Sequence, residues 1–168
     1  PASGKVEWHY ADGAATIPSS ALAGEMLFVP SHGLTALKLG ADGKSFEQKW
    51  RSGRLRPGTA SPLVHGQKVY SLNNAGVLAC ADVDSGNRLW QLRLDGPFGG
   101  SPVVADNHMY IFSEEGLAQV VDLTAPEGNV VGKMDLGEMI QCSPAVSNGA
   151  LFVRSNGHIW KISRKTRL

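Results

Sequence analysis

The chain has 168 residues, of which 42% are hydrophobic and 18% are charged, so its composition is that of a folded domain with a core and not of a disordered or fibrous chain. Its 16 basic and 15 acidic residues give a formal net charge of +1, which offers no electrostatic reason to expect nucleic acid or an anionic membrane as a partner. No apolar run approaches the roughly 20 residues of a membrane span, and the polar opening residues 1–4 show no signal peptide.

A repeat runs through the chain and is its clearest feature. Ser-Pro pairs begin at Ser61, Ser101 and Ser143, and Ser19 with Ser20 holds the same place in the first unit, so the anchors recur every 40 to 42 residues. An aromatic residue follows the second anchor residue by eight positions in each unit: Phe28, Tyr70, Tyr110 and Phe152. A fixed internal period of this length indicates a repeat architecture.

Tryptophan marks the same register before three of the four anchors. Trp8, Trp50 and Trp90 each precede the next anchor by twelve positions. Before the fourth anchor no tryptophan is present, and Val130-Val131 occupies this region. Because these tryptophans fall at matching places in the repeat, we expect them to pack between neighbouring units.

The second unit shows how each repeat is built. Its predicted strands are residues 60–64, 68–72, 77–81 and 88–92. The turn Asn73-Asn74-Ala75-Gly76 has strong hairpin chemistry, since Asn and Gly tolerate positive φ. Short strands separated by Gly, Asn and Asp turns predict an all-β fold, and four strands in about 42 residues are typical of a propeller blade. A β-sandwich that mimics a repeat is the alternative, and the constant offsets argue against it.

We therefore expect one β-propeller domain over residues 1–168, made of four-stranded antiparallel blades. The predicted units are an unpaired outer strand at residues 4–14 and blades at residues 15–55, 56–96, 97–138 and 139–168, the last incomplete.

The stretch from Gly76 to Trp90 carries a family resemblance. It places a small or apolar run after Gly76, then Asp82, Ser85, Gly86 and Trp90. This order resembles the signature of pyrroloquinoline-quinone-like repeats, the family of the quinoprotein alcohol dehydrogenases and of the propeller lipoprotein of outer-membrane assembly. The sequences of residues 110–116 and 143–146 are similar to those in the C-terminal half of large propeller proteins of planctomycete-like bacteria. The resemblance implies a β-propeller that is periplasmic or extracellular.

The same resemblance raises the question of whether the chain binds pyrroloquinoline quinone, as the dehydrogenases of the family do. Dehydrogenases of the family use two adjacent cysteines, a stacking tryptophan, an aspartate base and acidic or amide ligands to calcium. Here Cys80 and Cys142 are far apart, and no acidic trio has calcium-like spacing. The five histidines fall at different repeat positions and form no metal motif. We expect no cofactor, no metal and no catalytic residue. The alternative is a fragment of a quinone-dependent dehydrogenase whose catalytic blades lie outside this chain.

The expected function is therefore non-catalytic binding or scaffolding through contact with another protein, whose identity the sequence does not name. In a propeller the turn between strands two and three shares a face with the crossing to the next blade, and function resides on such loops. The candidate interaction face comprises His32, Arg51, Arg54, Arg56, Asn73, Asn74, Glu114, Glu115, Asn156 and His158, with Phe98 and Met139 from the crossings. The three arginines are the densest basic spot, suited to carboxylate or phosphate. Solvated loop residues are the alternative interpretation.

The two ends of the repeat complement each other. The fourth unit has no fourth strand, whereas Lys5 to Tyr10 reads as an unattached fourth strand with Trp8 in register. An open strand edge favours pairing. Three arrangements follow: a four-bladed ring within one chain, a homodimer in which two chains complete an eight-bladed ring, or a longer parent chain. Rings of seven or eight blades are usual in the family the chain resembles, which favours the last two.

Overall fold

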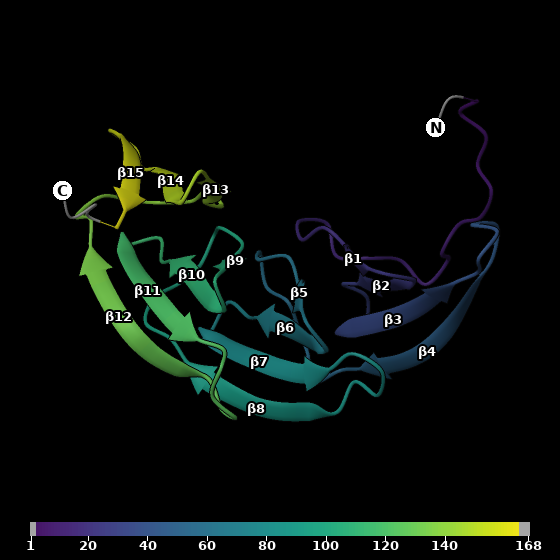
Figure 1. Cartoon of the computed structure of the whole chain (residues 1–168). Helices are drawn as coiled ribbons and strands as arrows, with labels where there is room; N and C mark the ends of the chain where they lie inside the picture. The colour runs from purple at the N-terminus through teal and green to yellow at the C-terminus, as the bar shows by residue number, and fades with distance from the viewer. Residues whose placement is uncertain (1–2, 165–168) are drawn as a thin grey trace.

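A computed structural model describes residues 3–164. Within this range the chain forms fifteen strands and no helix, so none of the described residues belongs to a helix able to cross a membrane. The strands make four separate antiparallel sheets, three of four strands and one of three. Figure 1 shows these sheets side by side around an open arc. The all-β, partial-propeller fold expected from the sequence is confirmed.

The four sheets are the blades, and each is built from consecutive strands. Blade 1 contains β1 (Ala21–Ala23), β2 (Met26–Val29), β3 (Leu34–Leu39) and β4 (Phe46–Ser52). Blade 2 contains β5 (Leu63–His65), β6 (Lys68–Leu72), β7 (Val77–Asp82) and β8 (Arg88–Arg93). Blade 3 contains β9 (Val103–Ala105), β10 (His108–Phe112), β11 (Leu117–Asp122) and β12 (Asn129–Asp135). Blade 4 contains β13 (Ala145–Ser147), β14 (Ala150–Arg154) and β15 (Ile159–Ser163).

The strands of blade 2 follow the sequence pattern closely. Strand β6 has the predicted bounds, and β7 and β8 each extend one residue further. Strand β5 begins at Leu63, three residues later than predicted. The reason is that Ser61, before this strand, bonds to the neighbouring blade and not along its own sheet.

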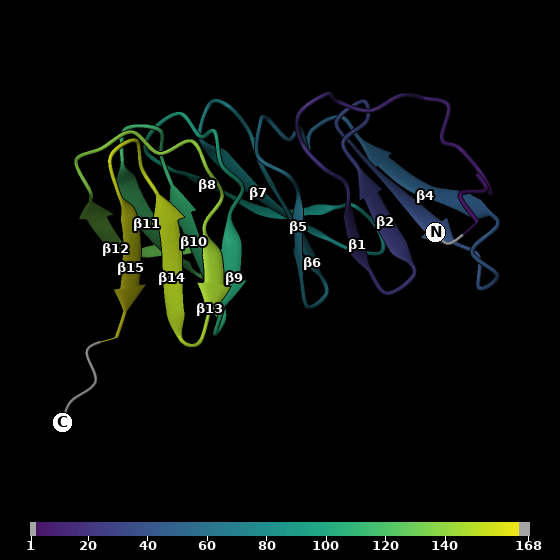
Figure 2. The same cartoon turned by 90° about the horizontal axis from the view of Figure 1, so that it is seen from above.

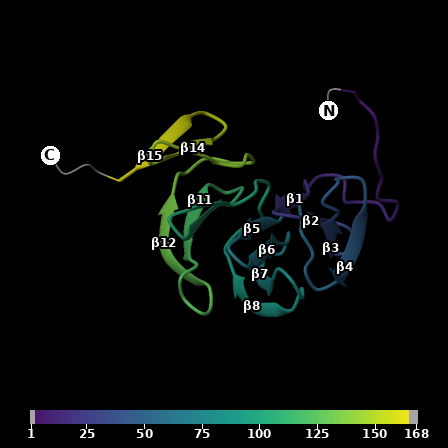
Figure 3. The same cartoon turned by 45° about the vertical axis from the view of Figure 1, so that its right-hand side comes forward.

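The blades taper toward the inside of the arc. Each innermost strand has three residues, whereas the outermost strands β4, β8 and β12 have six or seven. Figures 1 and 3 place blade 1 and blade 4 at the two separate ends of the arc. Strand β15 pairs only with β14 among the described residues. The four-bladed ring closed within one chain is therefore not formed.

A row of serine hydroxyls joins the blades along the inner rim. The backbone N–H of Ser19 donates to Ser61 Oγ, that of Ser61 to Ser101 Oγ, and that of Ser101 to Ser143 Oγ, each at 2.9 Å. Each bond links one blade to the next at the same repeat position. The serine of the repeated anchor is thus the residue that holds consecutive inner strands at a constant spacing.

Tryptophans join the blades on the outer side. Trp50 of β4 donates from Nε1 to the carbonyl oxygen of Val83 in the next blade at 2.8 Å, and its ring lies over Gly86. Trp90 of β8 lies in the same way over Gly128 of blade 3. A Cβ on either glycine would lie within 2.6 Å of the indole. The expectation that these tryptophans pack between blades is confirmed.

The third junction lacks this indole, and the residue in its place is Gly132. Trp50 pairs with Ala36, Trp90 with Cys80 and Gly132 with Val120, each beside a bulge at the same point of the ladder. The sequence analysis named Val130-Val131 for this region, and the position twelve residues before Pro144, the offset of the tryptophans, is Gly132. Val131 is the residue that the bulge skips, and its side chain is 52% exposed.

Residues 5–10 pair with no strand of the described chain, so the outer strand expected at residues 4–14, which was predicted to be unpaired, stays a prediction. A strand needs a ladder partner, and this segment lies beyond the outer edge of blade 1. Trp8 nevertheless donates from Nε1 to the carbonyl oxygen of Gly43 at 3.1 Å, and its ring packs at a tilt against Phe46, with 4.9 Å between ring centroids. Gly43 lies in the β3–β4 turn, which corresponds to the β7–β8 turn that receives Trp50.

The hydrophobic core lies between the blades and is uneven. Among the described residues, the cluster between blades 2 and 3 has twelve buried members and that between blades 1 and 2 has eight. The cluster between blades 3 and 4 has only four: Phe112, Ala118, Ile140 and Val153. The third junction, where glycine replaces tryptophan, is therefore the most sparsely packed.

Candidate functional site

The loops on one side of the arc form a continuous face, seen along the upper edge in Figure 2. We call it the crossing face; it comprises the turns at residues 30–33, 73–76, 113–116 and 155–158 and the crossings at residues 53–62, 94–102 and 136–144. Turns and crossings are bonded to each other. The N–H of Gly58 donates to Leu72 O at 2.9 Å, Glu114 N–H to Pro97 O at 2.9 Å, and Asn156 N–H to Met139 O at 3.1 Å. The face is thus a set of braced loops.

The three arginines at the end of β4 and in the first crossing have different roles. Arg51 donates from Nη2 to the Asp12 carboxylate and, at 2.9 Å, to Tyr10 Oη, while its Nε donates to Thr35 Oγ1 at 3.1 Å. The hydrogen bond to Arg51 lowers the pKa of Asp12, and its counterpart raises the pKa of the guanidinium. Arg51 therefore fastens the segment before blade 1 to β4, and it is not a free cation of the face.

Arg54 and Arg56 remain exposed on the crossing. Arg56 donates from Nε to the carbonyl oxygen of Gly53 at 3.0 Å, which orients its guanidinium without neutralising it. Because Asp12 is already paired with Arg51, these two arginines are left as the positive charge of this part of the face.

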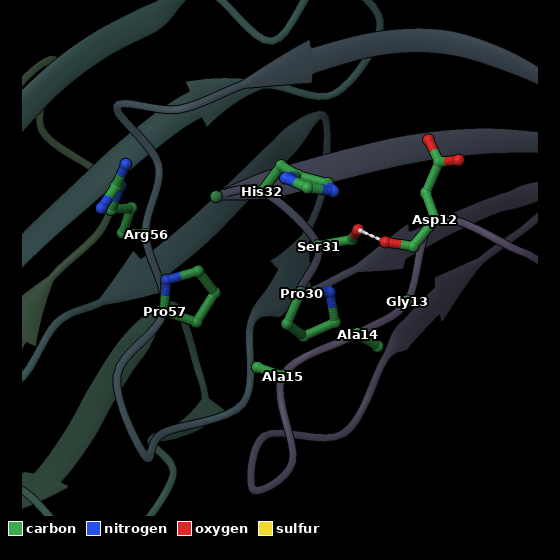
Figure 4. A pocket seen from close by; sticks show the side chains of 10 residues that line it. Asp12, Gly13, Ala14, Ala15, Pro30, Ser31, His32, Arg56 and Pro57 are labelled. Atoms are coloured by element: carbon green, nitrogen blue, oxygen red, sulfur yellow. Dashed lines mark hydrogen bonds between the residues drawn. The ribbon is translucent and has the colours of Figure 1, made fainter.

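A hollow of about 440 Å³ opens beside Arg56. Figure 4 shows Arg56 and Pro57 on one side, His32 above, and the backbone around Asp12 on the other. The full lining is Asp12, Gly13, Ala14, Ala15, Pro30, Ser31, His32, Gly33, Arg56 and Pro57. His32 is exposed and holds a left-handed φ of 50°. A hollow edged by a guanidinium and an imidazole suits an anionic group.

The other candidate residues are largely engaged in the loops themselves. Asn73 Oδ1 accepts from Val77 N–H at 2.9 Å, and Asn74 Oδ1 accepts from Thr59 N–H at 3.0 Å. Glu114 bonds through its backbone to both adjoining crossings, whereas Glu115 is exposed. The amides thus shape the face, and the charged side chains are what it presents to solvent.

Phe98 does not belong to the surface. It is 3% exposed and packs in the core between blades 2 and 3, whereas Met139 is 49% exposed. Phe98 lies three residues before its anchor Ser101, the same position at which Ile140, also buried, lies before Ser143. The expectation that Phe98 contributes to the face was wrong.

Glu138 is a polar residue that the sequence analysis missed. Its carboxylate accepts from the Ser155 hydroxyl and, at 3.1 Å, from Gly157 N–H, and it lies 2.6 Å from His158 Nδ1. The Ser155 hydrogen bond, followed by His158, lowers the pKa of Glu138. No sequence signal marked this residue, because its partners are seventeen to twenty positions away. The cluster braces the last turn against its crossing.

The ten candidate residues therefore lie at three separate blade junctions. His32 and Arg56 share the hollow, Asn74 meets the crossing before β5, and His158 meets Glu138. No single pocket unites them in the described part of the chain.

Within residues 3–164, the tryptophans and cysteines that the sequence analysis compared with a dehydrogenase site lie apart from one another. Residues 3–164 contain no group of three metal-ligating side chains. Trp50 and Trp90 are occupied between blades by Gly86 and Gly128, so neither is available to stack on a ring in the funnel. Cys80 is buried in blade 2, and Cys142 lies in the crossing before blade 4.

Comparison with known families identifies the repeat. The model of the family described as outer membrane protein assembly factor BamB, a family of pyrroloquinoline-quinone-like repeats, matches residues 1–131 and again residues 75–167. The chain belongs to this family. The two overlapping matches cover nearly the whole chain, as the repeat in the sequence predicts. A search of curated proteins gave no match.

Solved structures agree on the fold. BamB from Moraxella catarrhalis superposes with a TM-score of 0.67 at 20% identity, over 83% of this chain and 43% of that one. The computationally designed Ika4 protein gives 0.65 at 13% identity, over 95% and 96%. A europium-containing methanol dehydrogenase gives 0.58 at 18% identity, over 77% and 26%. The chain thus spans less than half the length of BamB.

Proposed function

We propose that this chain is part of a non-catalytic propeller that binds another protein through its crossing face. Membership of a family described as an outer membrane protein assembly factor supports this proposal, and so does the similarity to BamB. The same description supports a location in the periplasm or at the cell exterior. The observation that carries the proposal is the braced crossing face, on which Arg54 and Arg56 remain exposed.

The partner segment at this place is acidic. Arg51 is neutralised by Asp12, so Arg54 and Arg56 provide the local positive charge, and the adjoining hollow of about 440 Å³ has room for a carboxylate side chain. A guanidinium recognises a carboxylate by a pair of parallel hydrogen bonds, which lysine does not offer. Arg56→Lys should therefore weaken binding although it keeps the charge.

Site-specific photo-crosslinking tests the proposal. A photoreactive phenylalanine is placed at Arg54 or Glu115 on the crossing face, and at Leu89 or Val131 as controls; both control residues are 52% exposed on outer strands. In the native host we expect a discrete adduct from the first pair, lost when Arg56→Glu is added, and none from the controls. Adducts that appear equally at all four positions, or at none, would contradict the proposal.

We propose in addition that further blades complete the ring beyond the two ends of the arc. The contact of Trp8 with Gly43 supports this, since it repeats the contact of Trp50 with the next blade. Within blades 1 and 2 the tryptophan of the outer strand lies 5.8 Å from the aromatic residue of the second strand, as in Trp50 with Phe28. Phe152 is the aromatic residue of blade 4, where the described chain supplies no outer strand. Trp8 is therefore expected beside Phe152 of a neighbouring unit.

Disulfide trapping with light scattering distinguishes the two sources of those blades. Lys161 lies opposite Phe152, at the ladder position of Ala36, which lies opposite both Phe28 and Trp50, so it is the position expected directly across from Trp8. If a second copy supplies the blades, Trp8→Cys combined with Lys161→Cys should give a covalent dimer under mild oxidation, and the unmodified chain should have the mass of a dimer. The control pair Trp8→Cys with Val131→Cys should not cross-link. A monomer that forms no disulfide would reject the second copy and leave a longer chain as the source.

A further inference from the structure

A small apolar cavity of about 190 Å³ lies between blade 3 and blade 4. Blade 3 contributes Tyr110, Phe112, Ala118 and Gly132 to its walls, and blade 4 contributes Leu151 and Ile162. It is separate from the crossing-face hollow, which lies at blade 1. The cavity coincides with the junction that has the fewest buried core residues.

The cavity occupies the position that an indole fills in the other two junctions. Gly132 stands in the register of Trp50 and Trp90, beside the same bulge. The walls correspond as well. Trp90 shares its core cluster with Tyr70, Met109 and Val121. The residues at the corresponding strand positions one blade further on are Tyr110, Leu151 and Ile162, and these line the cavity. Part of the surface that receives an aromatic ring is thus repeated at the third junction, without the ring.

The backbone does not require glycine at this position. Gly132 is not among the glycines with a left-handed φ, and a Cβ there would meet only Val120, at an ordinary 3.6 Å. The missing side chain therefore leaves open space that a larger residue would fill. A cavity wall of this kind loses contact energy unless another group occupies it.

The interior of the cavity is apolar. The polar lining residues Gln119 and Lys133 direct their polar groups to Asp95 in the crossing between blades 2 and 3. Gln119 Nε2 donates to Asp95 O at 2.9 Å, its Oε1 accepts from Asp95 N–H at 3.0 Å, and Lys133 Nζ pairs with the Asp95 carboxylate. Apolar cavities tend to remain dry, and one of about 150 Å³ suffices for a benzene-sized molecule.

We propose that this cavity is a binding site for a small planar aromatic molecule of indole size. The ligand takes the place that the side chains of Trp50 and Trp90 hold elsewhere in the chain, with one edge against Gly132 and its faces against Tyr110 and Leu151. Binding joins blade 4 to blade 3 and so stabilises the end of the arc. The inference does not depend on the proposed protein partner of the crossing face.

Titration with 5-fluoroindole, followed by ¹⁹F NMR, tests the proposal. The intact chain should bind the probe saturably with one site and show a higher Tm in its presence. Gly132→Trp fills the cavity and should lower the affinity at least tenfold, and Ala118→Leu, which fills it from the neighbouring strand β11, should do the same. Val131→Trp is the matched control, because it adds an indole on the same strand at an exposed position, and it should leave the affinity unchanged.

Two results would overturn the proposal. One is the absence of saturable binding up to the solubility limit of the probe. The other is binding that survives both Gly132→Trp and Ala118→Leu, since the probe would then lie elsewhere. The two filling variants act from different strands, so a folding defect in one does not prevent the other from deciding the outcome.

Discussion

The contact of a tryptophan with a glycine of the next blade can be measured with three alanine substitutions. Gly128→Ala places a methyl group 2.5 Å from the Trp90 ring, where φ is not left-handed. Gly66→Ala meets nothing within 4 Å but has a φ of +58°. Gly86→Ala combines both, with a φ of +69° and the Trp50 ring at 2.6 Å. The series therefore separates backbone strain from the steric conflict between blades.

The expected losses of unfolding free energy follow from these geometries. Gly66→Ala should cost about 1 kcal/mol, the usual penalty of a left-handed L-residue. Gly128→Ala should cost about 2 kcal/mol, because a well-packed indole must shift. Gly86→Ala should cost about 3 kcal/mol or more, since the shift also breaks the hydrogen bond from Trp50 Nε1 to Val83 O.

Urea denaturation followed by circular dichroism measures the three values, and tryptophan fluorescence reports the indoles directly. For a domain of this size each 1 kcal/mol corresponds to a Tm change of about 2–4 °C. A Gly128→Ala variant as stable as the unmodified chain would refute the reasoning, because the indole would then not be held between blades. A Gly86→Ala loss equal to that of Gly66→Ala would refute it equally.

Two other predictions concern the rim and the core. Ser101→Ala removes the hydroxyl that accepts from Ser61 N–H at 2.9 Å, and it should lower the unfolding free energy measured in urea by about 1 kcal/mol. The control Ser147→Ala, at an exposed position of β13, should change it by less than about 0.5 kcal/mol. Equal effects of the two variants would contradict the role given to the serine row. Burial raises the pKa of the Cys80 thiol to about 11 and also raises the pKa of Tyr70. The unfolded chain therefore loses these protons first, and the unfolding free energy should fall from about pH 9 to pH 11. Cys80→Ala should make the fall of Tm with pH less steep, and an unchanged fall would contradict the raised pKa of Cys80.

The repeat, the strand order and most strand bounds were predictable because they depend on local features. Anchors such as Ser61 and aromatics such as Tyr70 recur at constant offsets, and the turn at Asn73 to Gly76 has chemistry that local sequence reveals. What holds one blade to the next was less visible. The hydroxyl of Ser101 bonds to a residue forty positions away, and nothing local in a serine shows that partner.

Contacts between blades account for most of what the sequence did not reveal. Gly132 lies twelve positions before Pro144, at the offset of the tryptophans, but a glycine gives no signal of the indole that it replaces. The outer strand expected at residues 5–10 stays a prediction, because a strand forms only where a neighbouring strand offers its hydrogen bonds and none of the described strands lies beside this segment. The cavity beside Gly132 could not be predicted, since its walls come from two blades.

The proposed function requires that the chain binds a protein and not a quinone. Calorimetric titration of the purified chain with pyrroloquinoline quinone in the presence of calcium tests it most directly, with an absorbance spectrum of the mixture as the second signal. The account predicts no saturable heat and a spectrum equal to the sum of its components. Stoichiometric binding of the quinone, with a shifted spectrum, would contradict the account and favour the alternative of a dehydrogenase fragment.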